Sequence, residues 1–123
     1  MRLRLRLQGI ERMEIRRIND DIAVAPQITA EHVPAIAEAG FRSIVCNRPD
    51  SEDGAVPHDR VEQAAKAAGL EFRFIPVVSG AISEDNVRDM AAALKALPTP
   101  VLAYCRTGGR CMNLYGLVQQ TNG

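Results

Sequence analysis

The stretch Val101-Leu-Ala-Tyr-Cys105-Arg-Thr-Gly-Gly-Arg-Cys111 decides the fold. Its first four residues form a short apolar run, as expected of a buried parallel strand. The run ends at Cys105, and a glycine-bearing loop then leads into a helical segment that extends to about Gln120. Strand, loop and helix in this order predict a site at the carboxyl edge of an α/β sheet.

The rest of the chain alternates short apolar runs with helical patterns. Further strands are predicted at Met13–Ile18, Ile22–Ala25, Ser43–Cys46 and Glu71–Val78. Helices are predicted from Thr29 to about Ala39, over about His58–Ala68, and from Ser83 to about Ala96. This alternation predicts an α/β fold of three layers, in which helices cover both faces of a mainly parallel sheet of four to five strands.

Composition limits the classes of function. The chain has 123 residues, 46% hydrophobic and 24% charged, which fits one compact domain and excludes a disordered or fibrous protein. Fifteen basic residues balance fifteen acidic ones, and only five residues are Phe or Tyr, so a nucleic-acid partner is not expected. No run approaches the ~20 apolar residues of a membrane span, so a membrane partner is not expected either.

The three cysteines, Cys46, Cys105 and Cys111, are an odd number without the spacing of a zinc site. They predict reduced thiols in a cytoplasmic protein that needs no metal or other cofactor. A transient disulfide between Cys105 and Cys111 is an alternative.

Residues 1–12 differ from the rest because Arg and Leu alternate along them. They are predicted to be a disordered extension, or the product of translation that begins upstream of a natural start at Met13. A single domain at 13–121 is predicted to follow them. A two-sided strand is the alternative.

The loop after Cys105 suits an anion. Backbone N–H groups of such a loop can point inward together, and the first turn of a helix adds N–H groups and partial positive charge. Glycines permit the backbone angles that this needs, and the arginines add cationic groups. The predicted anion-binding loop comprises Arg106, Thr107, Gly108, Gly109, Arg110 and Cys111.

A cysteine at the rim of such a loop has its pKa lowered to roughly 3.5–7.5. We therefore predict that Cys105 is a catalytic nucleophile and that Arg110 is its catalytic partner. The alternative is a small buried residue that merely ends a strand.

The loop Cys105-Arg-Thr-Gly-Gly-Arg110 resembles the C-R-x-G-x-R active-site loop of rhodanese-type sulfurtransferases. Three longer stretches more closely resemble the phosphatase-like domain family of the beta-lactamase hydrolase-like proteins, formerly a domain of unknown function. These are Ile22-Ala-Val-Ala-Pro-Gln-Ile28, Ile44-Val-Cys-Asn-Arg-Pro-Asp50 and Phe74-Ile-Pro-Val-Val-Ser-Gly-Ala-Ile82, and the resemblance covers Met13 to about Gln120. It implies a fold similar to that of tyrosine and dual-specificity phosphatases. Some members are described as sulfur transferases or are fused to a metallo-β-lactamase-like persulfide dioxygenase, which implies that enzyme as a partner.

Spacing bears on the choice between sulfur and phosphoryl chemistry. Cysteine phosphatases place an arginine six residues after the nucleophile, whereas Cys111 holds that position here and Arg110 comes one step early, as in rhodaneses. A shorter loop favours a terminal persulfide sulfur over a phosphoryl group.

The general acid of dual-specificity phosphatases is an Asp after an Ile-Pro strand, and the matching position here is Ser79. Asp50 or Asp85 could swing in, and Arg48 could add positive charge, so these four are possible accessory residues. Loss of a general acid removes ~10²–10⁴-fold in rate, whereas sulfur transfer between thiols needs no such acid.

The sequence therefore favours a rhodanese-like sulfurtransferase that carries a Cys105 persulfide and takes sulfur from a small anionic donor. One alternative is a phosphatase-like hydrolase that forms a phosphocysteine on a phosphoester substrate. A second is a non-catalytic anion-binding or thiol redox module that uses Cys105 and Cys111.

Overall fold

The computed structural model describes residues 13–122, so the predicted extension at 1–12 lies outside the described residues. The strands are β1 (Arg16–Arg17), β2 (Ile22–Ala25), β3 (Ser43–Cys46), β4 (Glu71–Phe74) and β5 (Val101–Tyr104). The helices are the 3₁₀ turn η1 (Ala30–His32), α2 (Val33–Glu38), α3 (His58–Ala67), α4 (Glu84–Ala96) and α5 (Gly109–Asn122).

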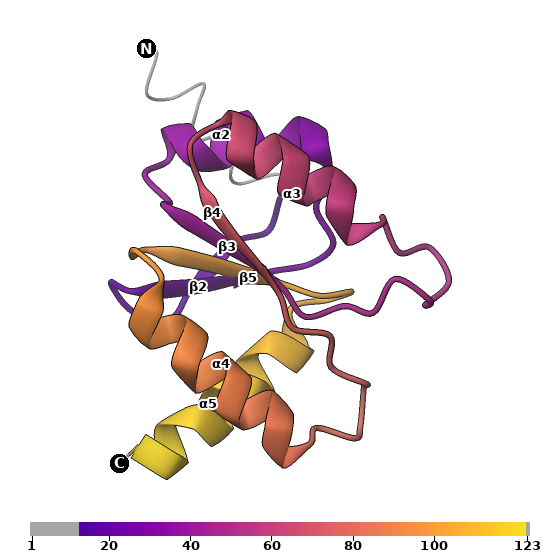
Figure 1. Ribbon diagram of the computed structural model, residues 1–123, viewed down its shortest axis with the longest axis vertical. Helices are drawn as coiled ribbons and strands as arrows, with labels where there is room; N and C mark the ends of the chain where they lie inside the picture. The colour runs from indigo at the N-terminus through magenta and orange to yellow at the C-terminus, as the bar shows by residue number, and fades with distance from the viewer. Residues whose placement is uncertain (1–12, 123) are drawn as a thin grey trace.

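The five strands form one sheet in the order β1-β2-β5-β3-β4, in which only β1 runs antiparallel to its neighbour. Helices α2 and α3 cover one face, and α4 and α5 cover the other (Figure 1). The predicted α/β fold with three layers is confirmed. Because Tyr104 pairs with both Ala25 and Cys46, strands β2, β5 and β3 end level with one another. The residues that follow them therefore meet at one edge of the sheet.

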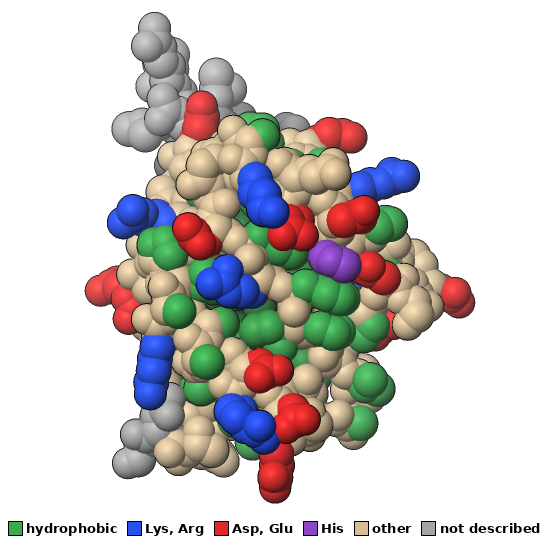
Figure 2. All heavy atoms as spheres, viewed as in Figure 1, with side chains coloured by type: hydrophobic (Ala, Val, Ile, Leu, Met, Phe, Trp, Pro, Cys, Tyr) green, Lys and Arg blue, Asp and Glu red, His purple; other side chains and the backbone are tan. Residues whose placement is uncertain are grey.

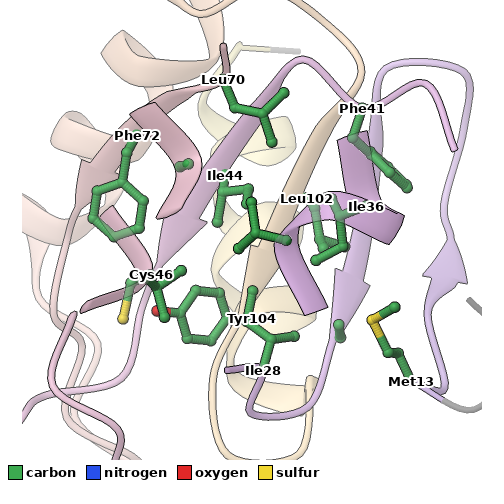
Figure 3. Close-up of a cluster of buried hydrophobic side chains, with 14 of the residues drawn as sticks. Met13, Ile28, Ile36, Phe41, Ile44, Cys46, Leu70, Phe72, Leu102 and Tyr104 are labelled. Atoms are coloured by element: carbon green, nitrogen blue, oxygen red, sulfur yellow. The ribbon is translucent and has the colours of Figure 1, made fainter. Parts of the chain in front are cut away.

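Each face of the sheet has its own buried core, because side chains alternate between the faces along a strand. In β5, Leu102 and Tyr104 pack under α2 and α3, whereas Val101 and Ala103 pack under the helices of the other face. Figure 3 shows Tyr104 among the first group, with its ring beside Cys46. Helix α5 joins the second core through Cys111, Leu114 and Val118.

Three predicted elements differ in extent. The first strand is only Arg16–Arg17, and the fourth ends at Phe74 instead of Val78. The fourth ends early because Pro76 has no N–H to continue the ladder of hydrogen bonds. Ile75 and Val77 still donate to the carbonyls at the end of β3, those of residues 46 and 47. The helix predicted from Thr29 starts as the 3₁₀ turn and becomes α-helical only at Val33.

Charges of both signs are interspersed on the face that Figure 2 shows, without a large patch of one sign. Among residues 13–122, no helix is long and apolar enough to cross a membrane.

Candidate active site

The loop between β5 and α5 is fixed to β2 by its backbone. Cys105 N–H donates to the carbonyl of Ala25, and the Cys105 Sγ accepts the N–H of Gly108 at 3.1 Å. Gly108 has φ +93°, and a Cβ there would lie 3.4 Å from the carbonyl carbon of Ala25. Only glycine allows this turn without strain, and α5 begins at the next residue.

The environment of Cys105 favours its thiolate. A hydrogen bond from the Cys111 side chain is the largest influence, and the backbone N–H groups of Cys111, Thr107 and Gly108 add to it. Burial opposes them, but the pKa of Cys105 still falls to about 5. Burial raises the pKa of Cys111 well above its usual value, so Cys111 keeps the proton that it donates. A neutral Cys111 beside an ionised Cys105 follows at neutral pH.

Cys105 lies deeper than the sequence predicted. Its exposure is 1%, so it sits beneath the loop and not at the rim. The loop N–H groups point at the sulfur itself because the strand delivers Cys105 into the centre of the turn. A substrate that reaches the sulfur would compete with it for these donors.

Arg110 stands on the first turn of α5 and is 9% exposed. Its Nη1 donates to Glu52 Oε2 at 2.8 Å and to the carbonyl of Val77 at 2.9 Å, while Nη2 donates to Glu52 Oε1 at 3.2 Å. The Nε of Arg110 is buried and has no hydrogen-bond partner among the described residues. The three hydrogen bonds use three of the five N–H donors of this guanidinium, so the buried Nε–H and one N–H of Nη2 are left over for a ligand.

Arg48 is buried, at 5% exposure, and does not reach the loop as an accessory cation. Its guanidinium donates to Glu52 Oε1, to Gln27 Oε1 and to the carbonyl of Asp53. Hydrogen bonds from Arg110 and, more weakly, Arg48 hold the pKa of Glu52 below its usual value although burial raises it. Arg48 therefore helps to fix Glu52, and Glu52 in turn holds Arg110 in place.

A cleft of about 520 Å³ lies over the loop. Its lining residues are Ser79, Gly80, Ile82, Arg106, Thr107, Gly109, Arg110 and Asn113. The sequence thus predicted five of them, whereas Gly108 and Cys111 are buried and do not line the cleft.

Like Arg48, two more of the proposed accessory residues lie elsewhere. Asp50 accepts hydrogen bonds from the backbone N–H of His58 and pairs with its ring, and Asp85 pairs with Arg88 on α4. Neither lines the cleft.

Glu52 and Asn113 are site residues that sequence reasoning missed. Glu52 lies 58 positions before Arg110, so no local pattern in the sequence connects the two. Asn113 follows Arg110 by three positions, so helical spacing could have placed it on the same face.

A second depression, of about 670 Å³, lies between α4 and α5. It is lined largely by the apolar parts of Val87, Ala91 and Leu117 and contains no residue of the loop. Because Arg106, Thr107 and Arg110 of the loop line the cleft of about 520 Å³, we take that cleft as the candidate active site. Within residues 13–122, no group of three His, Cys, Asp or Glu could hold a metal ion.

Comparison with known protein families gives one match over nearly the whole chain. The model described as "Beta-lactamase hydrolase-like protein, phosphatase-like domain" matches residues 14–122. A beta-lactamase hydrolase-like protein of Agrobacterium fabrum is 35% identical over 112 residues, which are 90% of this chain and 26% of the relative. A beta-lactamase hydrolase-like protein of Xylella fastidiosa is 34% identical over 112 residues, which again are 90% of this chain and 26% of the relative. The chain therefore spans about a quarter of the length of the curated relatives it matches.

Solved structures have the same fold. A candidate phosphatase from Neisseria meningitidis is 33% identical, with a TM-score of 0.80 over 90% of this chain and 80% of that one. A candidate phosphatase from Shewanella putrefaciens is 18% identical, with a TM-score of 0.81 over 92% and 75%. The catalytic domain of the yeast PP-IP phosphatase Siw14 is 15% identical, with a TM-score of 0.68 over 86% and 64%. The last two show similarity of fold alone.

Proposed function

Because the chain belongs to the family of phosphatase-like domains of beta-lactamase hydrolase-like proteins, we propose that it hydrolyses a phosphoester through a phosphocysteine on Cys105. The sequence favours sulfur transfer, but the comparisons support the phosphatase alternative and give the sulfurtransferase reading no support. In this proposal, 13–121 is a single domain that acts in the cytoplasm on a small anionic substrate.

The observation that carries the proposal is the state of Cys105. With a pKa of about 5, its thiol is almost wholly ionised at neutral pH, so it needs no separate base to become a nucleophile. It lies between the end of β5 and the first turn of α5, where backbone N–H groups and the helix end attract anions.

The chemistry has two steps. The Cys105 thiolate attacks phosphorus, an S–P bond forms, and the P–O bond to the leaving group breaks with its electron pair on oxygen. Water then attacks the phosphocysteine, the S–P bond breaks, and inorganic phosphate and the thiolate are released, with the water proton passing to phosphate or solvent. As negative charge moves from sulfur to the phosphoryl oxygens, the N–H of Gly108 and the free Nε–H of Arg110 can donate hydrogen bonds to those oxygens.

Turnover of p-nitrophenyl phosphate tests the proposal. We expect hydrolysis by the wild-type protein, a phosphorylated Cys105 in acid-quenched samples by intact mass, and loss of both in Cys105→Ser. Cys46→Ser is the matched control, because burial raises the pKa of Cys46 and its thiol stays protonated. Absence of turnover and of phosphocysteine would rule the phosphatase function out.

A sulfurtransferase remains the second candidate because only four residues separate Cys105 from Arg110. There, the thiolate would attack the outer sulfur of thiosulfate and release sulfite, and an acceptor would take the sulfur from the Cys105 persulfide. Thiocyanate formed from thiosulfate and cyanide, and the mass of one added sulfur atom on Cys105, would support it. A persulfide dioxygenase partner belongs to this candidate alone. If neither substrate is turned over and a Cys105–Cys111 disulfide forms readily, the non-catalytic redox module is favoured.

A further inference from the structure

The cleft offers a leaving group no proton. None of the described residues that line it is Asp, Glu, His, Cys or Tyr. The ionisable groups there are the guanidinium groups of Arg106 and Arg110, which do not release protons near neutral pH. The hydroxyls of Ser79 and Thr107 are also far too weak as acids to substitute for a carboxyl group.

The nearby carboxylate cannot take that role. Glu52 is engaged by Arg110 and Arg48, and the hydrogen bond from Arg110 is the main cause of its lowered pKa. It is therefore ionised at neutral pH and faces the guanidinium groups. Asp50 and Asp85 have their own partners away from the cleft. A leaving group must then depart as an anion without being protonated.

The second feature of the cleft that bears on the leaving group is the side chain of Arg106. Unlike Arg110, its guanidinium has no hydrogen-bond or ion-pair partner among residues 13–122, and it is exposed in the lining of the cleft. An uncommitted cation beside the reacting centre stabilises a leaving group that carries negative charge.

We propose that the substrates are phosphoanhydrides, in which the group that leaves is itself a phosphate, and that Arg106 binds that leaving phosphate. The inference rests on the proposed phosphatase function and specifies its substrate class. In the first step the S–P bond forms at Cys105, the bridging P–O bond breaks, and the departing phosphate keeps the electron pair. Its own acidity and the positive charge of Arg106 replace the missing proton donor.

Two aryl phosphates test the absence of an acid. Phenyl phosphate and p-nitrophenyl phosphate differ mainly in the pKa of the phenol that leaves. We expect kcat/KM to be about 10²-fold lower for phenyl phosphate, within the range that a positioned acid would supply. Ser79→Asp places a carboxyl group in the lining and should reduce this ratio, whereas Ser79→Ala should not. Equal kcat/KM values in the wild-type protein would overturn the inference, because they would reveal a proton donor.

Inorganic pyrophosphate tests the leaving phosphate. We expect Cys105-dependent cleavage of pyrophosphate. Arg106→Ala should lower kcat/KM for pyrophosphate about tenfold more than kcat/KM for p-nitrophenyl phosphate. This effect is smaller than the ~10²-fold loss typical of an enclosed donor, because Arg106 is exposed. Arg88→Ala is the control, since this exposed arginine lies on α4 and pairs with Asp85. Cleavage of p-nitrophenyl phosphate without cleavage of pyrophosphate, or equal losses in Arg106→Ala, would overturn the inference and leave the phosphatase function standing. No cleavage of either compound and no phosphocysteine would overturn both.

Discussion

Glu52 binds Arg110 from a loop 58 positions earlier in the chain, with Oε2 2.8 Å from Nη1 and Oε1 3.2 Å from Nη2. The same carboxylate accepts from Arg48, which is itself buried and anchored to Gln27. One acidic side chain therefore orients Arg110 at the start of α5. With the carbonyl of Val77, it leaves Nε–H and one N–H of Nη2 free among the donors of that guanidinium.

Glu52→Gln should weaken both the fold and the site. It leaves two nearly buried guanidinium groups without a counter-charge, and because Glu52 is 27% exposed we expect a loss of about 1–3 kcal/mol in the free energy of unfolding. The loss of Arg110 orientation should lower kcat/KM for p-nitrophenyl phosphate about tenfold. Glu62→Gln is the control, since its pair with Lys66 is on the surface and is worth under ~1 kcal/mol. Equal effects of the two variants on urea denaturation would contradict the stabilising role of Glu52, and equal kcat/KM values would contradict its positioning role.

Gly108→Ala should strain the loop. The residue has φ +93°, a backbone conformation that L side chains rarely adopt, so we expect a loss of about 1–2 kcal/mol in stability although the new Cβ would only touch the backbone of Ala25. The N–H that now lies 3.1 Å from Cys105 Sγ should also move, which raises the pKa of that thiol. Gly109→Ala is the neighbouring control, because its Cβ would lie 3.6 Å from Thr107 Oγ1, an ordinary contact. Thermal unfolding and the ultraviolet absorbance of the thiolate measure the two effects, and a tolerated Gly108→Ala would refute the account of the loop.

Cys111→Ala should raise the pKa of Cys105, because the Cys111 side chain makes the largest contribution to lowering it. The acidic limb of the profile of kcat/KM against pH should then move upward from about 5. It should not reach the ordinary value, since the backbone N–H groups of Thr107 and Gly108 remain. Cys111→Ser keeps a donor and should retain a low pKa. An unchanged profile in the alanine variant would show that the backbone alone stabilises the thiolate.

The sequence could predict what depends on neighbouring residues. Apolar runs located the inner strands, and Ser83 caps α4 as expected, with its Oγ accepting the N–H of Asn86. The loop residues also follow from one contiguous stretch. By contrast, the burial of Arg48 and the role of Glu52 depend on how the β3–α3 loop folds back onto α5, and no local pattern encodes that. The depth of Cys105 was missed for a related reason, because the register of β5 against β2 determines it.

The stability of the fold should depend on pH through Cys105. Its pKa is about 5 in the folded protein and 9.0 without the surrounding structure. Because the folded value is the lower one, ionisation stabilises the fold. The contribution is complete only above the unfolded value, and it is lost as pH falls through about 5. Between pH 5 and 8, the wild-type protein should therefore gain about 1 kcal/mol per pH unit over Cys105→Ser in urea denaturation. A difference that stays constant over this range would mean that the folded thiol is protonated, and the nucleophile would then need a separate base.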